Sequence, residues 1–287
     1  MSLVHLMDEI IDSQITIKVN GFLLGGLILY ILNKKKDTNK YKELVDIKYL
    51  LDIGEKNIII NKNLFLNTFN FFNIPNIRAN KRIGPHHKDV ISVIVGSLLG
   101  DCYGNQKSRE GIRFIYKQSI IHKEYLFWLY NFFYLRGYCS NLEPKIYTRK
   151  LKINNQIKEY YGYEFNTFTF RSFNKIYKMF YNNGKKRIKL SLVDYLDPLA
   201  LAIWIMDDGC KVSSGLKLST HSFKYSDLIF LISLLFNKFG LKTSIQSGNN
   251  KYDQYVIYIW AESMSTLVNI VKPYIIPSMK YKLGKYI

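Results

Sequence analysis

The sequence contains two apolar stretches, IVGSLLGDCYG at residues 94–104 and LAIWIMDDGCK at 201–211, and each leads to an aspartate beside a glycine. The apolar residues recur at helical spacing, so Asp101 and Asp208 are expected at the ends of two helices. A carboxylate at a helix C-terminus opposes the helix dipole and is not a favourable end charge. A solvated loop position would explain one such aspartate. Two of them in equivalent places favour a shared chemical role.

The two aspartates are expected to emerge together if their helices pack side by side. Gly96 and Gly100 are four residues apart, which clears one helix face for close approach, and Ala202 gives smaller relief on the second helix. Two adjacent carboxylates repel each other unless a cation lies between them. A hard divalent ion such as Mg²⁺, which prefers oxygen ligands, meets this need. In a protein that faces a polyanion, the arrangement suggests metal-assisted hydrolysis of phosphodiesters.

The composition favours a polyanionic partner. The chain of 287 residues has 41 lysines and arginines against 22 aspartates and glutamates, which gives a net charge of +19. Such a surplus creates a positive field that attracts nucleic acid. An anionic membrane is the competing partner, but the most apolar segment, Phe22–Leu32, is too short to span a bilayer, so no stable membrane partner is expected. The three cysteines lack the spacing of a zinc site, which fits a reducing compartment.

The two motifs belong to an internal repeat. Each is followed by a loop that opens with a glycine, Gly104 or Gly209, and then by a short strand and an amphipathic helix. The helices are predicted at Lys123–Leu135 and Tyr225–Phe239, because apolar residues recur there at helical spacing and a glycine follows. A pair of strands and a closing helix complete each half.

Residues 84–190 and 191–287 therefore read as two tandem, pseudo-symmetric copies of an αββαββα unit, which places the chain in the α+β class. Residues 1–83 lie outside the repeat as an N-terminal extension of unknown role.

The two motifs resemble those of the LAGLIDADG homing endonucleases, in the single-chain form with two motifs, and above all the omega-type mitochondrial intron endonucleases. The stretches LAIWIMDDG at 201–209 and VKPYIIPSMKYKL at 271–283 carry the likeness, which extends over about residues 84–287. The resemblance implies that the motif helices form the interface between the halves. It also implies two saddle-like antiparallel sheets that straddle double-stranded DNA. The expected target is a long asymmetric DNA site, and the protein is expected to be a monomer.

The resemblance assigns Asp101 and Asp208 as the ligands of Mg²⁺ or Mn²⁺ ions that serve the cutting of the two strands. The earlier acid of each family motif is replaced here by Leu99 and Met206, which leaves the metal-binding acid intact. Asp207 is an added acid beside Asp208, and we expect it to be structural.

Further catalytic residues follow from the same resemblance. A basic residue near the end of each half matches Lys186, with Lys185 as a close rival, and Lys282. Ile203 stands where a glycine is common in the family, which puts the tightness of helix packing in question.

A polar residue on the strand after each motif often orders the attacking water in the family. Gln118 is the candidate in the first half, and Thr220 or His221 occupies the equivalent place in the second.

Basic and polar side chains of the predicted strands are candidates for contacts to bases and phosphates, because arginine and lysine favour guanine edges and phosphate oxygens. For each of them a solvated surface charge is an equally good explanation. The candidates are Arg113, Lys117, Lys145, Arg149, Lys152, Lys217, His221 and Lys242.

Three functions fit these features. The favoured one is a site-specific double-strand DNA endonuclease, encoded by a mobile intron. The alternative is an intron RNA maturase on the same scaffold, which would bind its own intron RNA. A non-catalytic DNA-binding regulator is disfavoured because both acids are present. A mitochondrial location, or a plastid one, is expected from the resemblance and from the abundance of residues with A/T-rich codons.

Overall fold

The computed structural model describes residue 78 and residues 81–108, 111–153, 156–249 and 254–287. The prediction for residues 1–83 and the apolar segment Phe22–Leu32 therefore fall almost entirely outside the described part. No helix within that part is long and apolar enough to cross a membrane.

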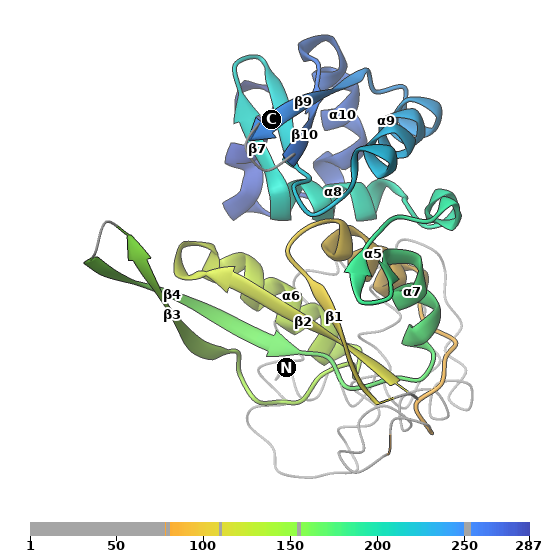
Figure 1. Ribbon diagram of the computed structural model, residues 1–287, viewed down its shortest axis with the longest axis vertical. Coiled ribbons are helices and arrows are strands. Elements are labelled where there is room, and N and C mark those ends of the chain that lie inside the picture. Colours follow the sequence, from red (N-terminus) through yellow and green to blue (C-terminus); the bar gives the residue numbers. More distant parts are fainter. Residues whose placement is uncertain (1–77, 79–80, 109–110, 154–155, 250–253) are drawn as a thin grey trace, which may run out of the picture. The chain divides into compact units, whose positions relative to one another are not determined.

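The first half contains seven principal elements (Figure 1). They are α5 (Lys88–Leu99), β1 (Tyr103–Ser108), β2 (Gly111–Ser119), α6 (Lys123–Leu135), β3 (Lys145–Ile153), β4 (Gln156–Asn166) and α7 (Phe173–Phe180).

The second half repeats this order. Its elements are α8 (Pro198–Asp208), β7 (Gly209–Val212), β8 (Gly215–Ser219), α9 (Tyr225–Phe239), β9 (Thr243–Asn249), β10 (Gln254–Ile259) and α10 (Met264–Val271). The two four-stranded sheets have equivalent orders, β1-β2-β4-β3 and β7-β8-β10-β9, and all their pairs are antiparallel. The predicted α+β repeat is confirmed, while the domain limits at residues 84, 190 and 191 stay predictions.

The loops predicted after the two motifs are wrong, because Gly104 lies in strand β1 and Gly209 begins strand β7. Both strands are edge strands of their sheets. Their residues are mostly polar or partly exposed, so they lack the apolar alternation by which a strand is recognised in a sequence. Pairing with the inner strand defines them instead.

One face of each sheet carries helices and the other is open. In the first half, Phe114 and Tyr116 of β2 are buried together with Phe133 of α6. In the second half, Leu216 and Leu218 of β8 are fully buried on the helix side. Alternate residues of these strands therefore point to the open face, where basic side chains are available for a partner.

The halves meet where α5 packs on α8. Gly96 makes this contact possible, because a Cβ atom there would lie 2.3 Å from the carbonyl oxygen of Ala200 and 2.7 Å from Cβ of Ile203. Ile203 thus packs directly against Gly96, and the helices approach closely at this point without a glycine on α8. At the start of α8, Asp197 accepts hydrogen bonds from Ala200 N at 2.9 Å and from Ser92 Oγ of α5 at 2.6 Å, which caps α8 and joins the two helices.

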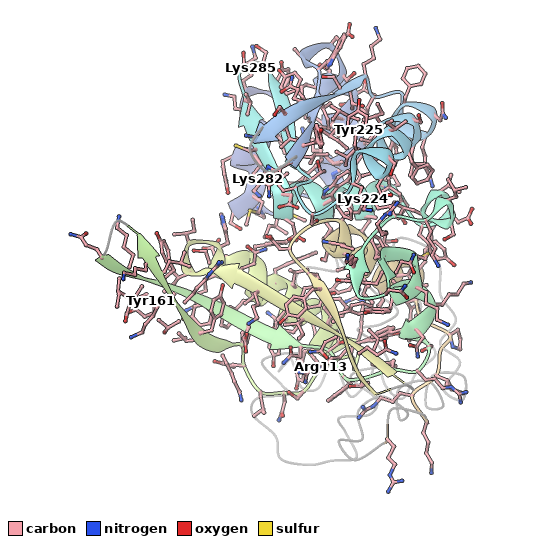
Figure 2. All side chains as sticks on the ribbon, in the orientation of Figure 1. Arg113, Tyr161, Lys224, Tyr225, Lys282 and Lys285 are labelled. Carbon is pink, nitrogen blue, oxygen red and sulfur yellow. The ribbon has the colours of Figure 1, made fainter. Side chains whose placement is uncertain are left out.

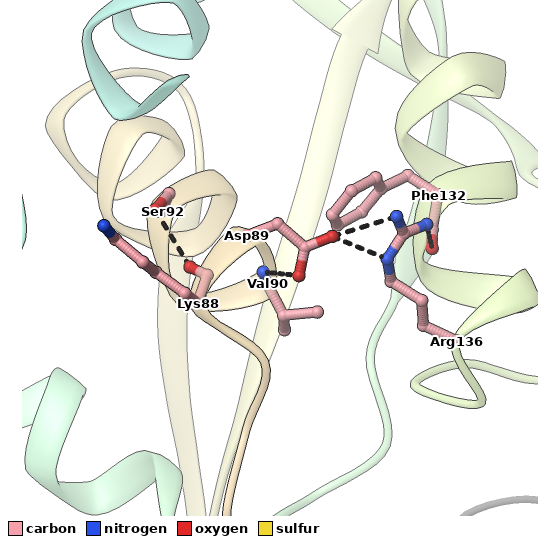
Figure 3. Close-up of polar contacts among 6 residues, drawn as sticks. All are labelled: Lys88, Asp89, Val90, Ser92, Phe132 and Arg136. Atoms are coloured by element: carbon pink, nitrogen blue, oxygen red, sulfur yellow. Dashed lines mark hydrogen bonds and ion pairs between the residues drawn. The ribbon is translucent and has the colours of Figure 1, made fainter. Parts of the chain in front are cut away.

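A second polar contact fixes the start of α5 (Figure 3). Asp89 in its first turn accepts from Nε and Nη2 of Arg136, at 3.0 and 2.9 Å, just beyond the end of α6. Nη1 of Arg136 also donates to the carbonyl of Phe132 at 3.2 Å. This ion pair lies within the first half.

His86 precedes α5 and links two segments of the first half. Its Nδ1 lies 2.9 Å from the hydroxyl of Tyr138, and its Nε2 lies 2.7 Å from Oγ of Ser172. Burial lowers the pKa of His86 to about 4. The imidazole is therefore neutral in the folded protein across the physiological range.

We expect acid to destabilise the fold through His86. Between about pH 6.5 and 4, His86 is protonated in the unfolded chain but stays neutral in the folded protein. The contribution of His86 to the free energy of unfolding is therefore complete above this pH range and is lost as the pH is lowered through it. The full effect of one histidine with this shift is about 3 kcal/mol. Urea unfolding at pH 7.0 and 4.5 should show this loss in the wild type and a smaller one in His86→Gln. Equal losses would exclude His86 as the cause.

Candidate active site

The ends of the two motif helices bring three carboxylates together. Gly100 ends α5 and Asp101 follows it, while Asp207 and Asp208 are the last residues of α8. The backbone N–H of Asp101 donates to Oδ2 of Asp207 at 3.4 Å, across the junction of the halves. A Cβ atom at Gly100 would lie 2.4 Å from Cβ of Asp207, so the glycine leaves the space in which this aspartate sits.

Gln118 of β2 connects the acids. Its Nε2 donates to Oδ2 of Asp101 at 2.8 Å and to Oδ1 of Asp207 at 3.3 Å. The side chain is only 7% exposed, which restricts it to this orientation. Asp207 packs against the first helix and shares the amide that orients Asp101, and its structural role stays a prediction.

Two lysines take equivalent positions at the two helix ends. Nζ of Lys186 donates to the carbonyl of Gly100 at 3.2 Å, and Nζ of Lys282 donates to the carbonyl of Asp207 at 2.8 Å. Each of these carbonyls belongs to the residue directly before a motif aspartate. A cation at a helix C-terminus is favourable, so each lysine is held where it also lies close to the acids. Figure 2 labels Lys282 near the junction of the halves.

The electrostatics of the site reflect crowded acids. Burial and the neighbouring Asp101 raise the pKa of Asp208 to about 7, against the pull of the two lysines. Burial also raises the pKa of Asp101, although part of this residue faces solvent, and it raises that of Asp207 well above its usual range. Burial lowers the pKa of Lys186 and of Lys282. Further positive charge at this place would relieve the repulsion among the carboxylates.

The oxygen donors at this place fit a hard divalent cation for which the protein supplies only some of the ligands. Asp101 and Asp208 provide carboxylate oxygens from two helices, while the carbonyls of Gly100 and Asp207 are already used by the lysines. In the described part of the chain, no three His, Cys, Asp or Glu side chains form a ready-made metal cluster. Mg²⁺ is commonly bound by one or two carboxylates together with substrate phosphates and water, so two carboxylates are enough.

The polar residues on the strands after the motifs are not equivalent. Gln118 lies within β2 opposite Tyr163, whereas Thr220 directly follows the last residue of β8, Ser219, which pairs with Val256. Thr220, however, is buried and donates its hydroxyl to the carbonyl of Tyr255 at 2.9 Å. His221 is exposed, with its ring against Gly248. Neither residue shares the hydrogen bond to the acids that Gln118 makes, and their predicted role in ordering water stays a prediction.

Most of the predicted DNA-contact residues of the first half share the open face of its sheet. Lys117 of β2 and Lys145 of β3 both pair in register with Glu164 of β4, and Lys117 forms an ion pair with this residue at 2.5 Å. Arg113 and Arg149 have the same strand parity as these lysines.

Lys152 differs, because odd and even residues of β3 point to opposite sides and Lys152 is on the helix side of the sheet. Its predicted contact with DNA stays a prediction. It lies in the β3–β4 hairpin, which extends beyond the helices and also carries Tyr161 (Figure 2).

The second sheet offers fewer basic residues on its open face. Lys217 of β8 lies opposite Cys210 and Tyr258 in the strand register. Lys242 lies just before β9 and forms an exposed ion pair with Glu262 at 3.1 Å.

His122 belongs to the site and was missed by the sequence analysis. It precedes α6, and burial and the charge of Lys282 lower its pKa while Asp101 raises it, which places the ring near both groups. The ring stacks on Tyr281 of the second half, with centroids 6.5 Å apart and planes 7° from parallel. The only available signal was a histidine four residues after Gln118.

Paired acids at the ends of two packed helices, each helix leading into a four-stranded antiparallel sheet, define the LAGLIDADG class of proteins. The family described as LAGLIDADG DNA endonuclease matches residues 91–267, and this chain belongs to that family.

Individual relatives are similar over most of the same region. Cytochrome b mRNA maturase bI2 of Saccharomyces cerevisiae is 46% identical over 215 residues, which are 72% of this chain and 50% of the yeast protein. Intron-encoded endonuclease ai4 of Dictyostelium discoideum is 48% identical over 157 residues, which are 54% of this chain and 98% of that protein. This chain thus spans about half the length of the yeast maturase.

A solved structure is similar in fold. The homing endonuclease I-WcaI bound to its DNA recognition sequence aligns with a TM-score of 0.62 and 30% identity, over 73% of this chain and 93% of the other.

Proposed function

We propose that this protein is a site-specific, divalent-metal-dependent DNA endonuclease encoded by a mobile intron. The observation that supports this most directly is the convergence of Asp101 and Asp208 at the junction of the halves, with a lysine bound at each helix end. Family membership and the likeness to I-WcaI, a homing endonuclease bound to its DNA recognition sequence, point the same way.

The mechanism assigns a role to each side chain of the site. Asp101 and Asp208 would hold Mg²⁺ or Mn²⁺, which when bound polarises a phosphate and stabilises the leaving oxygen. Lys186 and Lys282 add fixed positive charge beside the phosphates, at the places where negative charge develops. Gln118 holds Asp101 in position and, through its remaining amide oxygen, can accept a hydrogen bond from the attacking water.

DNA would lie along the open faces of the two sheets. Arg113, Lys117, Lys145 and Arg149 on the first sheet, and Lys217 on the second, would contact base edges and phosphates. The two sheets have the same topology but different side chains, so a single chain would read a long, asymmetric site as a monomer.

A second function, intron RNA maturation, is favoured by one observation. The yeast protein to which this chain is 46% identical is named a cytochrome b mRNA maturase. Both activities can use one scaffold, because the basic surface that attracts DNA also attracts RNA. One relative is named an intron-encoded endonuclease and another a cytochrome b mRNA maturase, and both names support an organellar location. We propose that this location is the mitochondrion.

The endonuclease is tested with a plasmid that carries the intronless form of the host gene. With Mg²⁺ we expect one linear product, and with EDTA we expect no cleavage, because the acids lack their cation. Binding measured in EDTA should weaken steeply with salt, with a log–log slope of about −0.9 for each phosphate neutralised. Cleavage that persists in EDTA would contradict the metal assignment.

Failure to cut, together with tight and specific binding of the host intron RNA, would instead favour the maturase. The control is an equally long RNA of scrambled sequence, since a basic protein binds any RNA at low salt.

A further inference from the structure

Lys186 is carried by a short hairpin that has little stability of its own. Strands β5 (Tyr181–Asn182) and β6 (Lys185–Lys186) contain two residues each, joined by a turn with positive φ at Asn183 and Gly184. Isolated two-stranded hairpins are marginal in water even when they are longer. Other contacts must therefore hold the lysine at the helix end.

Contacts within the first half fix one side of this hairpin. The hydroxyl of Tyr181 accepts a hydrogen bond from the backbone N–H of Gly104 at 3.1 Å, and its ring stacks on Tyr177 with centroids 4.4 Å apart. These contacts hold β5 against β1. The backbone N–H of Arg187, the residue that follows Lys186, also donates to the carbonyl of Phe180 at 2.8 Å, so the first half fixes the backbone here but not the Arg187 side chain.

An ion pair with the second half fixes the other side. Arg187 directly follows Lys186, and its Nε lies 3.0 Å from Oδ2 of Asp227 while its Nη2 lies 3.1 Å from Oδ1. Asp227 is in the first turn of α9 and is 5% exposed. Such a two-pronged contact with a buried carboxylate fixes direction as well as distance. The Lys186 ammonium also lies 5.0 Å from the ring centre of Phe223, just before α9.

Lys282 needs no comparable anchor. It lies in the helical segment Pro277–Tyr286 and is 6% exposed, and its neighbours Met279 and Leu283 are buried in the second half. The packed segment itself therefore holds this lysine in place. The two lysines of the site are thus supported in different ways.

We propose that the Arg187–Asp227 ion pair holds Lys186 in position. Through this contact, cleavage of one DNA strand depends on how the two halves are aligned with each other. The inference rests on the proposed nuclease function. Asp227 is a positioning residue, because it touches neither the acids nor the lysine. When the pair is broken, the hairpin keeps only the contact of Lys186 with Phe223 on the second half, and Lys186 is expected to shift away from the carbonyl of Gly100. The site that contains Lys282 stays intact.

The test is Asp227→Asn, assayed by conversion of supercoiled plasmid through nicked to linear DNA. We expect one strand to be cut about 10- to 100-fold more slowly, with the nicked form accumulating, while affinity for DNA in EDTA changes less than about threefold. Lys186→Met should slow the same strand, and the double variant should be no slower than Lys186→Met alone, because both changes act on one group. Arg187→Lys keeps the positive charge but loses the two-nitrogen contact with Asp227, so it should slow the same strand to a smaller extent. This variant replaces Asp227→Asn in the test if Asp227→Asn folds poorly.

Asp89→Asn is the matched control. It breaks an arginine contact of similar length inside the first half, in which Nε and Nη2 of Arg136 both approach Oδ2 of a more exposed carboxylate. It should slow neither strand in preference to the other. Equal slowing of both strands by Asp227→Asn, or the same strand preference in Asp89→Asn, would overturn the proposal.

A second readout does not need nuclease activity. Acetylation of lysines by a dilute reagent, followed by mass spectrometry, should modify Lys186 faster in Asp227→Asn than in the wild type, with the exposed Lys185 as an internal reference. Unchanged protection of Lys186 would reject the positioning role. If the wild type cuts no DNA but the protection changes as expected, the proposed function fails while the positioning role stands.

Discussion

Gly96→Ala is expected to separate the two halves and to lower the melting temperature by about 4 to 8 °C. The added Cβ would lie 2.3 Å from the carbonyl oxygen of Ala200 and 2.7 Å from Cβ of Ile203. The first of these atoms is backbone of α8, so no side-chain rotation can relieve the conflict. Overpacking of a tight interior costs about 1 to 3 kcal/mol, and more where backbone must move. The gain in helix propensity from glycine to alanine is about 1 kcal/mol and offsets only part of this.

The effect on activity should exceed the effect on stability. α5 and α8 end at the acids, so a shift of one helix against the other moves Asp101 relative to Asp208. A misplacement of about 1 Å at a reacting centre can cost about 100-fold in rate. Thermal unfolding and plasmid cleavage of Gly96→Ala should be compared with Lys88→Ala, which changes an exposed residue of the same helix. A melting temperature within about 2 °C of the wild type would show that the helices can part at little cost.

The repeat and its acids could be predicted because they have local signals. Helical spacing in the two motifs, together with an aspartate at the end of each, was enough to locate α5 and α8 and to expect Asp101 and Asp208 at one place. The helices α6 and α9 were recognised by their apolar periodicity and by the glycines after them. Strands β1 and β7 lacked such a signal, because an edge strand with one neighbour needs no regular apolar face.

Contacts between distant residues could not be predicted in this way. Sequence left Lys185 and Lys186 as alternatives. Adjacent residues of a strand point to opposite sides, and it is Lys186 that reaches Gly100, which favours Lys186 for the proposed role. Thr220 directly follows β8, and its hydroxyl bonds to the backbone instead of the acids. The pair of Arg187 and Asp227 spans 40 residues and both halves, so no local pattern marks it.

Asp208→Asn should abolish cleavage while making the metal-free protein more stable. The asparagine has nearly the same shape but removes a charge from a group of carboxylates that repel one another, as the raised pKa of Asp208, about 7, indicates. Relief of such strain in a functional site typically adds about 1 to 2 kcal/mol. Loss of one electrostatic contributor to a reacting centre costs about 100- to 1000-fold in rate, and loss of a metal ligand should reach the upper end. Asp101→Asn should behave alike in activity, although it also weakens the contact with Gln118.

The opposite signs of these two effects separate a catalytic acid from a structural one. An aspartate that only supports the fold would lose stability on change to asparagine, and activity would fall with it. Urea unfolding in EDTA, plasmid cleavage in Mg²⁺ and DNA binding in EDTA should therefore be measured together. Asp194→Asn, which removes an exposed carboxylate from the segment Leu190–Asp194, is the control and should change none of them. Binding by Asp208→Asn should be unchanged or tighter, because one negative charge beside the phosphates is gone. A less stable Asp208→Asn that still cuts DNA would place this carboxylate in the scaffold and remove it from the reaction.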